Sequence, residues 1–221
     1  MSEKRLDWVD IAKGIGIIAM LIGHNDNSLL SIIYSFHMPL FFILAGYTIK
    51  PISYKELKKA TIKDIKRLLI PCVITRIIIF LGMVFLNNAS VIHEIKVFII
   101  CLIWGNHNGR GYGLEFPSIG RIWFLVALFW TKFFYRILLN KCGARERLPF
   151  LVLTSLVSML LGVHGIILPQ NFDMVFVCLL FMEIGNLLKE YDICKKINGG
   201  GALYSLPFGH FLVVRKVFGY Q

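Results

Sequence analysis

Charged side chains are scarce in this sequence: Asp, Glu, Lys and Arg make up 17% of the 221 residues, against about 25% in soluble domains. Hydrophobic residues make up 57%. This balance excludes a disordered chain, a coiled coil and an ordinary soluble domain. We therefore predict an integral membrane protein, long enough for about six or seven helices of ~20 residues.

Paired cysteines are also missing. The 5 cysteines are scattered, with neither a Cys-x-x-Cys pair nor the histidine spacing of a zinc site. We therefore expect no metal and interpret the cysteines as packing residues. No internal repeat is visible either, whereas transporter folds commonly contain repeated halves.

Acidic residues are outnumbered, 13 against 24 basic ones, which gives a net charge of +11. In a soluble protein this charge would suggest nucleic acid. Here, however, a dense basic cluster lies between Lys50 and Arg67, directly after two apolar runs. Such a cluster marks the cytoplasmic side of a membrane protein. We expect a cytoplasmic N-terminus and no nucleic-acid partner.

Long apolar runs account for most of the chain. Those with a length near the ~17–25 residues of a membrane span cover residues 8–24, 30–49, 68–86, 119–139, 149–168 and 173–188. They predict an all-α fold, a polytopic membrane helix bundle with six clear spans. Pro39 predicts a kink in the second span.

The run 91–104 is ambiguous, because it is short and carries His93, Glu94 and Lys96 near its start. Leaving it out of the spans keeps the basic loops on one side of the membrane. We therefore predict a re-entrant or surface segment here, within a large outer loop over residues 87–118.

The apolar pattern changes after Lys196, where prolines, glycines and cations interrupt it. A seventh span is not favoured there. We divide the chain into a membrane domain over residues 1–196 and an atypical C-terminal tail over residues 197–221.

Asp10, Lys13 and His24 share one face of the first span. Asp10 and Lys13 can pair because they are three residues apart on a helix. The step from Lys13 to His24 is close to three whole turns, a rise of ~16 Å. A charge at membrane depth is costly unless it is paired or faces water. The stripe is either a functional site or two interfacial charges and a helix-capping histidine, and the shared face leaves these two interpretations evenly balanced.

Ionisable residues also occur within the next two spans. His37 lies beside Pro39 and is either functional or hydrogen-bonded to a carbonyl freed by the proline. Arg76 in the third span should face the bundle interior. Its partner is either a carboxylate, such as Glu183, or an anionic group of a substrate.

Arg67 and Trp123 lie at the ends of spans. Arg67, in KDIKRLLIP, places a cation at the inner membrane surface, where it either sets orientation or holds phosphate. Trp123, in GRIWFLVALFW, lies near a boundary, where tryptophan commonly anchors a span.

Five segments, in this order, resemble the membrane-bound acyltransferase family 3, and within it the fucose O-acetylase-like proteins. They are LDWVDIAKGIGIIAMLIGH, FHMPLFFILAGY, KRLLIP, IWFLVALF and LPQNFDMVFVCLLFMEIG. The resemblance covers about Leu6 to Lys189, and its first two segments are the most specific. It implies transfer of an acyl group, commonly acetyl from acetyl-CoA, to a hydroxyl of an extracytoplasmic sugar or glycan.

The resemblance also implies roles for single residues. His24 is expected to be catalytic, with Lys13 supporting it or facing CoA and Asp10 as the acidic residue that precedes the cation. A histidine near neutral pKa suits removal of a hydroxyl proton. The residues expected to bind substrate are His37, Arg67 and Trp123 and, from its place in the third span, Arg76.

Members of this family usually continue through more helices, so we expect a C-terminally truncated member. Its expected partners are the lipid bilayer, acyl-CoA as donor and a sugar acceptor, and its expected location is the plasma (inner) membrane. The alternative is a non-enzymatic multi-span protein, either a transporter-like half or an inactive fragment. On charge alone, the intramembrane ionisable residues would suit a proton or anion pathway equally well.

Overall fold

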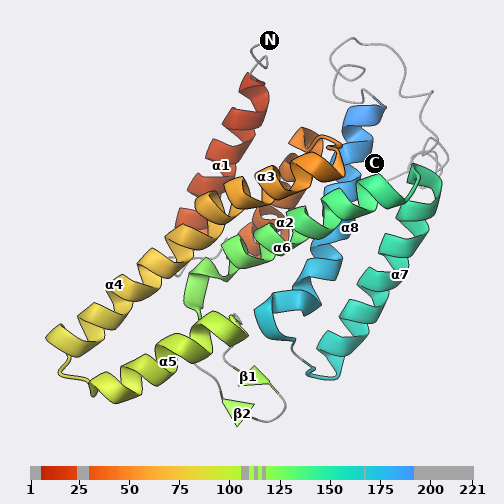
Figure 1. The fold of residues 1–221 in the computed structure, drawn as a ribbon. Coiled ribbons are helices and arrows are strands. Elements are labelled where there is room, and N and C mark those ends of the chain that lie inside the picture. The colour runs from red at the N-terminus through yellow and green to blue at the C-terminus, as the bar shows by residue number, and fades with distance from the viewer. Residues whose placement is uncertain are drawn as a thin grey trace, which may run out of the picture.

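The computed structural model describes residues 6–23, 30–105, 110–111, 114–115, 118–166 and 168–191. His24 and the tail 197–221 lie outside these residues. The described part of the chain is helical apart from loops and two short strands (Figure 1). Its α-helices are α1 (Asp7–Gly23), α2 (Leu30–Thr48), α3 (Tyr54–Asp64), α4 (Ile70–Leu86), α5 (Val91–Trp104), α6 (Trp123–Lys141), α7 (Ala144–Val163) and α8 (Phe172–Glu190).

Short elements complete the fold. A π-helical turn, η1 (Ile65–Leu69), joins α3 to α4, and 3-10 turns η2 (Gly120–Ile122) and η3 (Pro169–Asn171) precede α6 and α8. Strands β1 (Arg110–Gly111) and β2 (Leu114–Glu115) pair antiparallel. In Figure 1 the start of α1, α3 and the end of α8 lie at one end of the bundle, and α5 lies at the other.

Helices α2 and α8 form the centre of the bundle, and their backbones touch. A Cβ atom at Gly46 would collide with the Met182 carbonyl, and one at Gly185 would collide with the Ile43 carbonyl. Glycine at both positions therefore allows a crossing closer than side chains permit, as is common between membrane helices. The core around this crossing includes Phe42, which is 1% exposed.

Helices α3, η1 and α4 continue one another over Tyr54–Leu86. The Lys-rich segment, expected to be a loop, is therefore helical, and Ser53 begins it by donating its N–H to Glu56 Oε2 at 3.3 Å. The wide turn η1 ends two residues before Pro71, which cannot donate to the carbonyl four residues earlier, at Arg67. The N–H of Ile70 bonds to the Ile65 carbonyl there, one residue beyond the α-helical partner.

A helix forms at each of the six predicted spans, but six membrane spans are not shown. Within the described residues, three helices are long and apolar enough to cross a membrane: Tyr54–Leu86, Ala144–Val163 and Pro169–Glu190. Phe36–Thr48 is a shorter apolar helix. Helix α1 is shorter, with 17 residues, and α6 is less apolar, because it contains three cations.

Helix α5 has 14 residues, fewer than the ~20 that a straight span needs. It packs beside α4, with the rings of Phe80 and Phe98 6.2 Å apart. The segment is therefore too short for a straight span, and its re-entrant or surface placement stays a prediction. Two side chains of η3 bind the C-terminal end of α5. Gln170 Nε2 donates to the Leu102 and Ile103 carbonyls at 2.7 and 2.8 Å, and Asn171 Nδ2 donates to the Gly105 carbonyl at 2.5 Å.

The close crossing makes a testable prediction. Gly46→Ala or Gly185→Ala should lower the free energy of unfolding by about 1–3 kcal/mol, because the added methyl group would force the two backbones apart. Thermal unfolding in detergent, followed by tryptophan fluorescence, measures this loss. Gly162→Ala is the control, since nothing lies within 4 Å of a Cβ at that position. Equal melting temperatures for all three variants would contradict the prediction.

Candidate functional site

A cationic cavity lies where α1, α2, η1 and α6 meet, and its volume is about 490 Å³. Its charged lining residues come from separate parts of the chain: Lys13 from α1, Lys50 from the segment after α2, Arg67 from η1, and Lys132 and Arg136 from α6. No described carboxylate lines the cavity. The rest of the wall is largely apolar and includes Phe41, Phe124 and Leu128.

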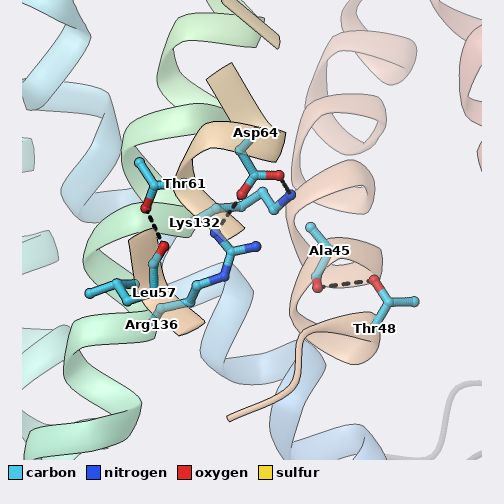
Figure 2. Close-up of polar contacts among 7 residues, drawn as sticks. All are labelled: Ala45, Thr48, Leu57, Thr61, Asp64, Lys132 and Arg136. Carbon is cyan, nitrogen blue, oxygen red and sulfur yellow. Dashed lines mark hydrogen bonds and ion pairs between the residues drawn. The ribbon is translucent and has the colours of Figure 1, made fainter. Parts of the chain in front are cut away.

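Asp64 holds two of these cations from outside the cavity. Lys132 Nζ donates to one carboxylate oxygen of Asp64, and Arg136 Nη1 donates to the other (Figure 2). Asp64 is only 4% exposed. A buried carboxylate is stable when cations and hydrogen bonds compensate its charge. The same ion pairs attach the end of α3 to α6.

Lys13 reaches the cavity from α1, and its Nζ lies 3.8 Å from Asp10 Oδ1. Both side chains are partly exposed, so this pair is weak. The predicted contact between Asp10 and Lys13 is therefore present. The third member of the predicted stripe, His24, lies outside the described residues, and its catalytic role stays a prediction.

Arg67 also lines the cavity, from the wide turn η1. A π-helical turn changes the direction of the side chains beside it and is frequent at functional sites. Trp123 does not line the cavity; it packs against both apolar core clusters at the start of α6. The substrate-binding roles of Arg67 and Trp123 stay predictions.

His37 is buried within α2 at 3% exposure and does not line the cavity. Its Nδ1 lies 2.7 Å from the Ile33 carbonyl, one helical turn earlier. The carbonyl that Pro39 frees belongs to Ser35. His37 thus has a backbone partner, as one alternative held, although not the expected carbonyl.

Arg76 is buried, but Glu183 is not its partner. Glu183 Oε2 instead accepts hydrogen bonds from Arg147 Nε and Tyr135 Oη, both at 2.6 Å. Glu183 lies in the bundle centre at 0% exposure, among α6, α7 and α8. Arg76 packs instead near Cys101 and Glu94 of α5, and its Nε has no hydrogen-bond partner among the described residues. It does not line the cavity.

Sequence reasoning placed Lys50 only within the basic cluster, and it missed Lys132, Arg136 and Asp64. One signal was available: Lys132 and Arg136 are four residues apart inside an apolar run, so both fall on one helix face. Two cations on one face of a predicted span need a carboxylate or an anion. The segment that supplies Asp64 is 68 residues earlier, and no local pattern connects it to α6.

The arrangement can bind a ligand that is both anionic and apolar. Lysine and arginine donate charge-assisted hydrogen bonds to phosphate, and arginine can do so with two nitrogens. Phe41 and Phe124, whose ring centroids are 5.5 Å apart, give the apolar wall an aromatic surface. Among the described residues no cluster of His, Cys, Asp and Glu could hold a metal ion.

Comparison with protein-family models shows which family the chain matches. Residues 6–210 match the acyltransferase domain model of the acyltransferase 3 family. The match includes every residue that lines the cavity. The comparisons with curated proteins and with solved structures gave no match.

The cavity should bind inorganic pyrophosphate, and Arg136→Met should weaken this binding about tenfold, because a charge-assisted hydrogen bond contributes about 1.5–3 kcal/mol. Isothermal titration calorimetry on detergent-purified protein measures the dissociation constant. Lys59→Met removes an exposed cation from α3 that does not line the cavity, and should change the constant less than twofold. A tenfold loss in both variants would point to net charge rather than to this cavity.

Proposed function

The chain belongs to the acyltransferase 3 family, and from this premise we propose that it is a membrane O-acyltransferase acting on sugars. The donor is acetyl-CoA, and the acceptor is a hydroxyl of an extracytoplasmic sugar or glycan. The fucose O-acetylase-like members are the branch it resembles. The protein lies in the plasma (inner) membrane with a cytoplasmic N-terminus.

The cationic cavity is the observation that carries this proposal. CoA has a ribose phosphate monoester, with about −1.5 to −2 charges at neutral pH, and a diphosphate bridge, with about one negative charge per phosphate. Five cations line the cavity, and its apolar wall suits the uncharged part of a nucleotide thioester. Its volume is within the ~300–1,000 Å³ of small-molecule sites.

The position of the cavity supports a cytoplasmic donor. It lies beside the Lys-rich helix α3, and basic segments of membrane proteins stay on the cytoplasmic side. Acetyl-CoA would enter from there, with its phosphates near Arg67, Lys132 and Arg136. Lys13 connects this cavity to the helix that leads toward His24.

Helix α1 indicates how acetyl-CoA would lie, from its phosphates in the cavity to its acetyl group. Lys13 lines the cavity, and His24 follows ~16 Å further along the chain if the helical rise continues. One turn after Lys13, Gly16 lets α1 approach α2 closely: a Cβ there would lie 3.0 Å from the Phe41 ring, which also lines the cavity. The pantetheine arm would follow this face of α1 toward the outer side.

The chemistry assigned to His24 is general base catalysis. Its imidazole takes the proton of the acceptor hydroxyl as the oxygen attacks the thioester carbonyl. The C–S bond then breaks, the acetyl ester remains on the sugar, and the CoA thiolate leaves and takes up a proton. The carbonyl oxygen gains negative charge during the attack, so an oriented donor or cation beside it lowers the barrier.

Labelled acetyl transfer tests the proposal. Membranes that contain this chain should transfer label from acetyl-CoA to glycan, and His24→Ala should abolish the transfer at an unchanged protein level. His164→Ala is the control, because it removes an exposed histidine at the end of α7. Label retained by His24→Ala would refute the role of His24. Absence of label from the parent chain would favour a fragment or a transport protein.

A further inference from the structure

Asp64 belongs to the functional site without lining it. Its carboxylate is buried, and each of its two oxygens accepts a hydrogen bond from one cavity cation, Lys132 or Arg136. We infer that Asp64 is a positioning residue for the donor phosphates: it holds these two cations side by side with their remaining donors directed at the cavity. This inference rests on the proposed function of the cavity.

The two cations need such a residue, because they are four residues apart on α6. Like charges at this spacing repel each other and destabilise the helix. Both side chains are largely buried, at 22% and 11% exposure, so water screens the repulsion poorly. One carboxylate placed between their ends removes the repulsion, and Figure 2 shows Asp64 in that place.

The hydrogen-bond capacity of the three groups leaves donors for a ligand. An ammonium has three N–H donors and a guanidinium has five. The described contact with Asp64 uses one nitrogen of each cation, Lys132 Nζ and Arg136 Nη1. Both residues line the cavity, whereas Asp64 does not. A phosphate can therefore bind from the cavity side while Asp64 keeps its place behind.

Asp64 also places a third cation. It is the residue directly before the wide turn η1, and Arg67 lies within that turn. The ion pairs to α6 fix the start of η1 against the bundle, and Arg67 then reaches the same cavity. The buried carboxylate of Asp64 thus fixes the positions of three of the five cations that line the cavity. A carboxylate that competed with phosphate for these cations would line the cavity, which Asp64 does not.

Calorimetric titration of detergent-purified protein with pyrophosphate tests this inference. Asp64→Asn should raise the dissociation constant about tenfold while the number of binding sites per chain stays the same. Glu56→Gln is the control: it removes one charge from the same helix, the exposed Glu56 does not line the cavity, and glutamine can still cap the helix. Its dissociation constant should change less than twofold.

Different results would overturn the inference in recognisable ways. A lower number of binding sites with an unchanged dissociation constant would mean that Asp64 serves folding alone. Tighter binding by Asp64→Asn would mean that the carboxylate competes with the ligand. Pyrophosphate binding that follows the expected pattern, together with no CoA binding by the parent chain, would reject the proposed function and leave the role of Asp64 intact.

The double variant Asp64→Asn with Lys132→Met covers the case in which the single variant does not fold. It removes one negative and one positive charge, so no cation is left without compensation at Lys132. Because Asp64 acts through Lys132 as well as Arg136, the double variant should bind pyrophosphate more weakly than Lys132→Met alone, but by clearly less than the tenfold expected in the parent chain. An undiminished loss, tenfold or more, would show that Asp64 does not act through Lys132, and would overturn the inference.

Discussion

The backbone contact between α2 and α8 is the constraint on which the rest of the bundle depends. Gly46 and Gly185 let the two helices meet without intervening side chains, and α6 and α7 pack around them. The contact also places the end of α2: Lys189 Nζ of α8 donates to the Ile49 carbonyl at 3.2 Å. Lys50 follows immediately and lines the cavity, so the crossing positions part of the site.

Two buried carboxylates organise the charges of the bundle, and their surroundings differ. Glu183 is enclosed among three helices, with Arg147 and Tyr135 as partners, which is the arrangement of a structural ion pair. Asp64 pairs with Lys132 and Arg136, which both face a cavity. The first cluster is closed to ligands, whereas the second presents its cations to one.

Helix α1 has two distinct faces, one apolar and exposed and one that reaches the site. Ile11, Ile15 and Ile18 form an exposed apolar stripe at helical spacing, which suits contact with lipid. Lys13 belongs to another face and reaches the cavity. A charge in this helix is tolerable because the Lys13 side chain is 43% exposed and lies 3.8 Å from Asp10.

The sequence by itself determined the helical membrane character, the positions of the six main helices, the short segment 91–104 and the contact of Asp10 with Lys13. These properties follow from apolar length and from the helical repeat, which are local. The tertiary structure alone decided that Glu183 pairs with Arg147 rather than Arg76, and that Asp64 gathers Lys132 and Arg136 beside Arg67. An unpaired buried charge is costly because it is desolvated, so the partner of each buried charge is set by how the helices pack. Spacing along the chain does not encode that packing.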